Sequence, residues 1–234
     1  MIKLTTQQLT QILNADLIGD EQVVVENINT DTRKAVSNSL FFALKGEHFD
    51  AHQYLDKAVE QGATALVVQQ ANTEIATPQL VVADTRLALG QLAKWLREKI
   101  NPHTVAMTGS SGKTTVKEMT ASILQQTAGN PEAVLFTNGN FNNDIGVPLT
   151  LLRLTEQHKF AVIELGANHQ GEIDYTTHLA QPEAALVNNV AAAHLEGFGS
   201  IEGVARAKGE IYRGLTPNGV AIINSEHNYI ELWQ

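Results

Sequence analysis

Short apolar runs alternate with helix-like stretches along most of the chain. Runs in which nearly every position is apolar occur at residues 105–107, 133–136, 161–165, 184–187 and 220–223. Helical patterns lie between them, at residues 147–152, 173–179 and 201–212. Strands that are apolar throughout are typical of sheets covered on both faces. The alternation with helices therefore predicts an α/β domain with a mainly parallel sheet.

The first third of the chain predicts a smaller α/β unit. Thr5 and Thr6 can cap a first helix. Further elements are expected as a helix at 51–61 and as strands at 23–28, 40–44, 65–68 and 80–82. A long helical pattern follows at 85–99. We therefore expect two domains, residues 1–84 and residues 85–234.

The stretch TGSSGKTT, residues 108–115, lies between a predicted strand and a predicted helix. Strand, glycine-rich turn and helix form the setting of a phosphate-binding loop. Glycines let backbone N–H groups converge on an anion, and the helix N-terminus adds further donors. Lys113 would contact the outer phosphates, and the hydroxyl of Thr114 would reach Mg²⁺. The candidate ATP-binding residues are Thr108, Gly109, Ser110, Ser111, Gly112, Lys113 and Thr114.

This loop departs from the common Walker pattern. That pattern has four residues between its two glycines, whereas Gly109 and Gly112 enclose only two. Met107 occupies the position of the missing first glycine. On this evidence alone, an ordinary strand-to-helix turn with a surface lysine remains an alternative. The helix that follows is expected to bury Val116, Met119, Ile123 and Leu124 on one side.

Composition excludes several classes of function. The 234 residues carry a net charge of −9, which argues against a sequence-independent hold on nucleic acid. Cysteine is absent, so disulfides, thiolate metal sites and cysteine nucleophiles are excluded. No apolar run reaches the length needed to cross a bilayer. We expect a cytoplasmic monomer that contacts neither nucleic acid nor membrane.

Polar residues at the predicted strand ends suggest where chemistry occurs, because ligands of open α/β sheets bind there. Glu164 lies in an otherwise apolar run, and a buried carboxylate is costly without a cation. A Mg²⁺ ion shared with Thr114 would supply one. Each of the other residues has a structural alternative: Asn138 as part of a turn-rich loop, His194 as a packing or capping histidine, and Lys208 as a solvated helix lysine.

Several motifs together resemble the Mur ligases, the ATP-dependent amide-bond ligases of cell-wall precursor synthesis. In the second domain these are TGSSGKT at 108–114, TNGNFNNDIGVP at 137–148, ELGANHQGEI at 164–173, AHLEGFG at 193–199 and AKGEI at 207–211. In the first domain they are DTR at 31–33, FALKG at 42–46 and FDAH at 49–52. The shortened phosphate loop is this family's own form. The match is closest to the type that joins D-alanyl-D-alanine to UDP-N-acetylmuramoyl-tripeptide.

The resemblance implies a reaction and a set of residue roles. ATP would phosphorylate the carboxylate of the UDP-N-acetylmuramoyl-tripeptide, and the amine of D-alanyl-D-alanine would attack the acyl phosphate, with ADP and phosphate as the other products. Lys113, His194 and Lys208 would be catalytic. The Mg²⁺ ligands would be Thr114, Glu164, His194 and Lys208, the last as a carbamate. Substrate contacts would come from Asp31, Arg33, Lys45, His52, Asn138 and Asn168, although Arg33 and Lys45 could equally form surface salt bridges.

The resemblance further implies a small UDP-sugar domain followed by a P-loop domain that is truncated. The family has a third domain that closes over ATP, so we expect the 234 residues alone to be inactive. Two alternatives remain. One is a related ATP-dependent ligase similar to folylpolyglutamate synthase, although a separate domain at 1–84 argues against it. The other is a precursor-binding protein without turnover.

Overall fold

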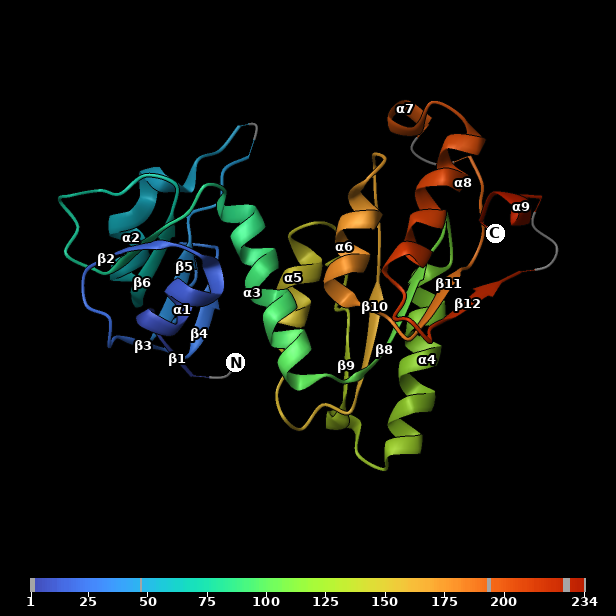
Figure 1. The fold of residues 1–234 in the computed structure, drawn as a ribbon, viewed down its shortest axis with the longest axis horizontal. Helices are drawn as coiled ribbons and strands as arrows, with labels where there is room; N and C mark the ends of the chain where they lie inside the picture. The colour runs from blue at the N-terminus through green and yellow to red at the C-terminus, as the bar shows by residue number, and fades with distance from the viewer. Residues whose placement is uncertain (1–2, 47, 193–194, 225–227, 234) are drawn as a thin grey trace. The chain divides into compact units, whose positions relative to one another are not determined.

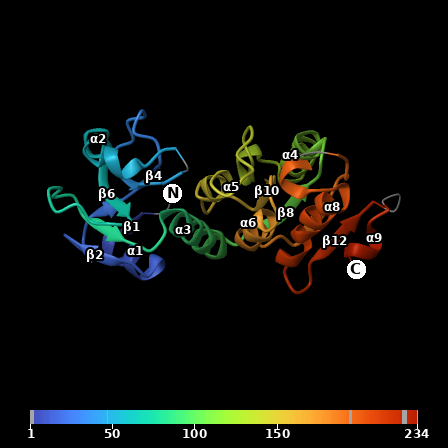
Figure 2. The same ribbon diagram turned by 90° about the horizontal axis from the view of Figure 1, so that it is seen from above.

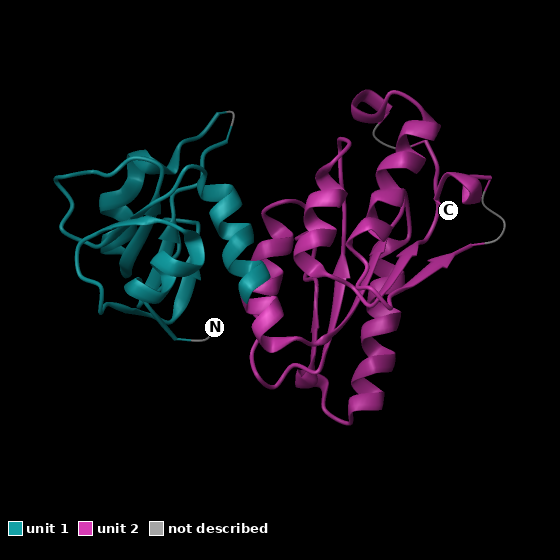
Figure 3. Cartoon of the chain, viewed as in Figure 1, with its two compact units in different colours: residues 1–95 teal, residues 96–234 magenta. Residues whose placement is uncertain are grey.

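The computed structural model describes residues 3–46, 48–192, 195–224 and 228–233. The chain divides into two compact units, residues 1–95 and residues 96–234 (Figure 3). The division lies within the helix α3, Thr85–Ile100. The sequence places the domain boundary just before this helix, and the domain limits themselves stay a prediction.

Unit 1 is a small α/β fold. Its strands are β1 (Leu4–Thr5), β2 (Asp16–Ile18), β3 (Val24–Val25), β4 (Asn27–Asn29), β5 (Ser39–Phe42), β6 (Ala63–Val68) and β7 (Gln79–Val81). Its helices before α3 are α1 (Thr6–Leu13), the 3₁₀-helix η1 (Ala51–Tyr54) and α2 (Leu55–Glu60). The main sheet has the order β2-β7-β6-β5-β4, in which only the β2–β7 pair is antiparallel. Residues of β5, β6, η1 and α2 share one hydrophobic core.

Local signals explain how unit 1 begins. Thr5 caps α1, because its hydroxyl accepts the N–H of Gln8 while the Gln8 side chain accepts the N–H of Thr5. The single strand expected at 23–28 is wrong in detail. The structure has two strands there, separated at Glu26, and β3 pairs with β1 while β4 pairs with β5. The sequence also missed β2, whose three residues are too short to show a period.

Unit 2 contains the long apolar strands. Its strands are β8 (His103–Thr108), β9 (Val134–Phe136), β10 (Phe160–Glu164), β11 (Ala184–Val187) and β12 (Val220–Ile223). Its helices are α4 (Lys113–Ala128), η2 (Pro131–Ala133), α5 (Gly146–Leu151), α6 (Glu172–Ala180), α7 (Leu195–Phe198), α8 (Ile201–Gly209), η3 (Glu210–Gly214) and α9 (Ile230–Trp233). Every strand pair of the sheet β12-β11-β8-β10-β9 is parallel, as predicted.

Helices cover both faces of this sheet. Helix α4 packs on β8, β9 and β10, while α6 and η3 pack on the opposite face (Figures 1 and 2). The strand β12 forms one edge of the sheet within the described residues, and Val220 and Ile222 on it are exposed.

The predicted buried side of α4 is partly wrong. Val116 and Leu124 pack against the core, but Met119 is 61% and Ile123 is 62% exposed. The buried stripe runs instead through Lys117 and Ala121. The hydrophobic pattern points to a different face of α4 from the one that is buried, because lysine counts as a polar residue in that pattern although Lys117 is buried.

Candidate functional site

The order of strands places the phosphate loop at the centre of the sheet. Strand β8 lies between β10 and β11, and the chain crosses over it on the way from β10 to β11. In register, Glu164 lies beside Met107 and Val187 lies beside Thr108. The residues that end β10 and β11 therefore flank the loop that ends β8. Ligands of open parallel sheets bind at such a point.

The loop has the backbone that anion binding requires. Gly112 has φ = +72°, a conformation that favours glycine, and the sixteen-residue helix α4 starts at Lys113. The Lys113 ammonium donates a hydrogen bond to the carbonyl of Gly109 at 2.8 Å, so the side chain folds back over the loop. The positive end of the α4 dipole and the charge of Lys113 therefore both lie at the phosphate loop.

Glu164 is the buried carboxylate beside this loop. It is 2% exposed, and its two oxygens accept hydrogen bonds from Thr114 Oγ1 at 3.0 Å and Asn142 Nδ2 at 2.8 Å. These groups line a cavity of about 450 Å³, together with Gly112, Lys113, Thr115, Gly139 and Asn140. A carboxylate, a hydroxyl and a carboxamide are oxygen donors that suit Mg²⁺. The structure therefore brings Lys113, Thr114 and Glu164 together, as the sequence suggested.

Asn142 and Lys117 are neighbours of this site that the sequence reasoning did not select. The Lys117 side chain is 1% exposed and donates to the carbonyl of Thr137 at 2.7 Å. The hydroxyl of Thr137 accepts the backbone N–H of Glu164 at 3.0 Å. Lys117 thus connects α4 to the ends of β9 and β10. The signal for Lys117 in the sequence is its position, one helical turn after Lys113.

Lys208 lies at the end of α8 and is 2% exposed. Its pKa is lowered to about 8, first by burial and then by the charge of Lys113, while the carboxylates of Glu172 and Glu210 oppose both effects. Its ammonium lies 5.8 Å from the centre of the Phe198 ring. The bland alternative, a solvated helix lysine, is therefore wrong.

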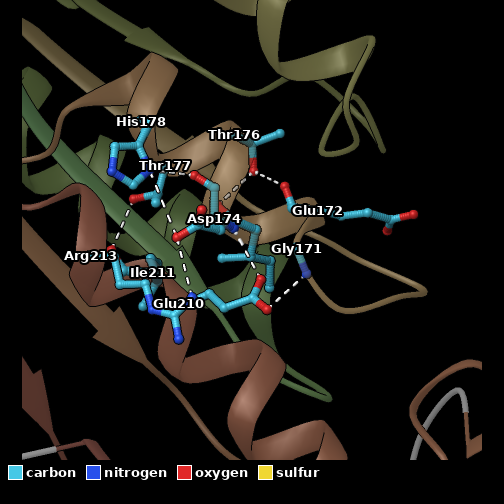
Figure 4. Close-up of polar contacts among 10 residues, drawn as sticks. Gly171, Glu172, Asp174, Thr176, Thr177, His178, Glu210, Ile211 and Arg213 are labelled. Atoms are coloured by element: carbon cyan, nitrogen blue, oxygen red, sulfur yellow. Dashed lines mark hydrogen bonds and ion pairs between the residues drawn. The ribbon is translucent and has the colours of Figure 1, made fainter.

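The segment after β10 is held by two carboxylates. Glu172 accepts the backbone N–H of Asn168 at 2.7 Å and that of His169 at 3.3 Å. Glu210, directly beyond α8, accepts the N–H groups of Gly171 at 2.8 Å and Asp174 at 3.1 Å (Figure 4). Glu210 thereby satisfies donors at the N-terminus of α6. Neither glutamate was selected from the sequence, although both occur within the quoted motifs.

The remaining predicted residues of unit 2 are Asn138, Asn168 and His194. Asn168 lines a separate cavity of about 510 Å³ with His169, Leu195, Glu196 and Gly197. Asn138 is exposed at the start of the loop that carries Asn142. His194 lies outside the described residues. Among the described residues, no cluster of three or more histidine, aspartate or glutamate side chains could hold a metal ion.

The four predicted residues of unit 1 fall into two pockets. Asp31 and Arg33 line one of about 560 Å³, which also contains the stacked rings of Phe49 and Tyr54. Arg33 donates two hydrogen bonds to Asp31, at 2.8 and 2.9 Å, and this pairing lowers the pKa of Asp31 to about 2.

Lys45 and His52 line the second pocket, also of about 560 Å³. His52 Nδ1 lies 2.6 Å from Asp50 Oδ1, and His52 Nε2 accepts the backbone N–H of Gln69 at 2.9 Å. Lys45 lies 3.8 Å from the Asp50 carboxylate. Both cations that had a surface salt-bridge alternative, Arg33 and Lys45, thus have an acidic partner.

Two family descriptions match the sequence across both units. "Mur ligase middle domain" matches residues 107–234, more than half of the chain, and "Mur ligase family, catalytic domain" matches residues 24–96. The chain belongs to the Mur ligase family. The first match begins one residue before Thr108, so the phosphate loop, Glu164 and Lys208 all lie within it.

Curated Mur ligases with the name UDP-N-acetylmuramoyl-tripeptide–D-alanyl-D-alanine ligase are similar over the whole chain. The protein of Haemophilus influenzae is 80% identical over 234 residues, which are all of this chain and 51% of that protein. The protein of Escherichia coli is 58% identical, over all of this chain and 50% of its own length. The chain spans about half the length of these relatives.

Solved structures show the same fold. MurF from Acinetobacter baumannii superposes with a TM-score of 0.92 at 46% identity, covering 98% of this chain and 50% of that one. A MurF ligase from Thermotoga maritima in complex with ADP has a TM-score of 0.80 at 28% identity, covering 89% of this chain and 48% of that one. No described helix is long and apolar enough to cross a membrane.

Proposed function

We propose that a protein containing this chain is an ATP-dependent ligase of peptidoglycan precursor synthesis. It joins D-alanyl-D-alanine to UDP-N-acetylmuramoyl-tripeptide and releases ADP and phosphate. The 80% identity to a relative with that name supports the substrates. The observation that carries the proposal is the hydrogen bond between Thr114 and the buried carboxylate of Glu164, beside a phosphate loop at the centre of a parallel sheet.

Unit 2 would hold the triphosphate. N–H groups at the start of α4 would receive the phosphates, and Lys113 would exchange its contact with Gly109 for a phosphate oxygen. Thr114 and Glu164 would ligate Mg²⁺, which when bound offsets the negative charge of the transferred phosphoryl group. Positive charge is needed there because an anionic carboxylate attacks an anionic phosphate. The substrate carboxylate oxygen would bond to the γ-phosphorus as ADP leaves.

Lys208 and His194 would serve a second Mg²⁺ near the substrate carboxylate. An ammonium cannot ligate a cation, so Lys208 would act after its amine has combined with CO₂ to form a carbamate. Only the neutral amine reacts with CO₂. The lowered pKa of Lys208, about 8, supports this proposal because it raises the neutral fraction near neutral pH.

Unit 1 would receive the UDP-sugar. Arg33 provides a guanidinium suited to phosphate oxygens, and the adjacent Phe49 and Tyr54 rings provide a stacking surface. His52 has a hydrogen-bond partner on each ring nitrogen, so its role would be to shape the neighbouring pocket rather than to contact substrate. Asn138 and Asn168 remain proposed substrate contacts.

Calorimetry tests the binding steps on the 234-residue chain. We expect binding of UDP-N-acetylmuramoyl-tripeptide, no binding of a folate, and Mg²⁺-dependent binding of a non-hydrolysable ATP analogue. Glu164→Gln should weaken the Mg²⁺-dependent part by about 10- to 100-fold. Glu132→Gln, an exposed glutamate on η2, is the matched control. Turnover is measured on a protein of the relatives' full length that contains this chain. ADP release independent of D-alanyl-D-alanine would contradict the proposed reaction.

A further inference from the structure

The phosphate loop of this chain is two residues shorter than the common Walker loop, and a second segment contacts it on one side. That segment is residues 188–191, which directly follow β11 and are called the strap below. Strand β11 pairs with β8, so the strap and the phosphate loop leave neighbouring strands at the same edge of the sheet.

Asn189 forms three hydrogen bonds with the phosphate loop. Its backbone carbonyl accepts the N–H of Ser110 at 3.1 Å. Its side-chain oxygen accepts the N–H of Ser111 at 2.9 Å, and its side-chain nitrogen donates to the Ser111 carbonyl at 2.9 Å. Two N–H groups of the loop are therefore paired with Asn189. Backbone N–H groups held in this way have a fixed orientation.

Other strap contacts have the same effect. Asn188 Nδ2 donates to the Ser111 carbonyl at 2.8 Å. The Ser110 hydroxyl donates to the carbonyl of Ala191 at 3.0 Å and accepts the Ala191 N–H at 2.9 Å. Side-chain and backbone groups of the strap thus bond to both residues between the two glycines.

The glycines of the loop lie directly against the strap. A Cβ atom on Gly109 would come within 3.1 Å of Asn188 Cβ and 3.2 Å of the Asn189 nitrogen. A Cβ atom on Gly112 would come within 2.9 Å of Asn188 Nδ2. These two glycines therefore provide room for the strap as well as the backbone conformation of the loop.

We propose that Asn189 is a positioning residue that completes the shortened phosphate loop. It holds the Ser110–Ser111 segment so that the N–H groups of Gly112, Lys113 and Thr114 face the phosphates, a task that the longer Walker loop performs with its own residues. This inference rests on the proposed function, because it assumes that the loop binds a nucleotide. It assigns Ser110 and Ser111 to the support of the loop, with their N–H groups bonded to Asn189 rather than to phosphate.

The test compares the wild-type chain with Asn189→Ala and with Asn218→Ala. Asn218 is an exposed asparagine on another loop of unit 2 and serves as the matched control. Calorimetry measures the affinity for the ATP analogue AMP-PNP with Mg²⁺, and thermal unfolding checks the fold. We expect Asn189→Ala to weaken AMP-PNP by about tenfold, as the loss of pre-organising hydrogen bonds implies, and Asn218→Ala to have no effect.

Hydrogen exchange without nucleotide gives a readout specific to positioning. The amide of Ser111 should exchange faster in Asn189→Ala, because it loses its side-chain acceptor. The amide of Ser110, whose acceptor is the Asn189 backbone carbonyl, and the amides of β8 and β11 should keep more of their protection. Ser110→Ala is a second, independent variant, because it removes both hydroxyl contacts with Ala191 but keeps every loop N–H. It should also weaken AMP-PNP.

Three outcomes would overturn the inference. Wild-type affinity in both Asn189→Ala and Ser110→Ala would show that the strap does not position the loop. Faster exchange throughout β8 and β11 in Asn189→Ala would show a general structural role. Absence of AMP-PNP binding in the wild-type chain would reject the phosphate site itself, and this inference with it.

Discussion

Glu164 and Lys208 show how burial changes what a charged side chain can do. Both are 2% exposed. Glu164 has hydrogen-bond donors on each oxygen, which offset the cost of removing a carboxylate from water. The Lys208 ammonium lies 5.8 Å from the centre of the Phe198 ring, and burial together with the charge of Lys113 lowers its pKa to about 8. The two residues are equally buried but differ in consequence. Glu164 is stabilised by its hydrogen-bond donors, whereas the Lys208 amine is more easily deprotonated.

We predict that the chain forms a carbamate at Lys208 when bicarbonate is present. The reactive neutral amine increases as the pH rises through about 8, so the carbamate signal should grow between about pH 7 and pH 9. Carbon-13 NMR with labelled bicarbonate measures it. The signal should disappear in Lys208→Met and persist in Lys159→Met, which changes an exposed lysine. An unchanged signal in Lys208→Met would contradict the assignment.

At the scale of elements, ends of helices and strands are joined by side chains from distant parts of the sequence. Glu210, at the start of η3, accepts N–H groups at the N-terminus of α6 (Figure 4). The hydroxyl of Thr177 in α6 donates to the carbonyl of Ile211 at 2.9 Å, and Arg213 lies 3.5 Å from Asp174. These contacts connect the segment after β10 to the segment that carries Lys208.

We predict that Glu210→Ala destabilises the protein by about 1–3 kcal/mol, because two N–H groups at the start of α6 lose their acceptor. Urea unfolding measures the change. Glu202→Ala is the control on the neighbouring helix α8. Glu202 forms an exposed ion pair with Arg206 and should matter by less than about 1 kcal/mol. Equal effects of the two substitutions would mean that Glu210 does not support α6.

At the scale of the whole molecule, each unit has its own core and its own candidate ligand. The pocket with Arg33 lies in unit 1, and the phosphate loop lies in unit 2. Separate sites in the two units suit the proposed reaction, which would bind a nucleotide-sugar and ATP at once. Each binding step should therefore respond to changes in its own unit.

We predict that Arg33→Ala weakens UDP-N-acetylmuramoyl-tripeptide about tenfold, through loss of a charge-assisted contact, and leaves AMP-PNP affinity unchanged. Lys34→Ala, at the exposed next position, is the control and should change neither affinity. Calorimetry on the 234-residue chain measures both ligands. A parallel loss of AMP-PNP binding in Arg33→Ala would show that the two sites depend on each other.

Much of the fold could be predicted because it is encoded in local patterns. The apolar runs at the centres of β8 and β10 are mostly buried on both faces, so their strand character is plain without the structure. The short strand β2 carries no such pattern, and it is held by pairing with β7, which is distant in the sequence. The exposed face of α4 was misjudged for a related reason, since the burial of Lys117 depends on the carbonyl of Thr137.

The sequence by itself determined the fold class, the family and the central candidates Lys113, Thr114 and Glu164, because residue types and spacings are local information. Only the tertiary structure decided which side chains meet. It places Asp31 and Arg33 in one pocket and Lys45 and His52 in another. It also forms the hydrogen bonds of Asn142 with Glu164 and of Asn189 with the phosphate loop. Such contacts join residues far apart in the chain, and strand order and register create them.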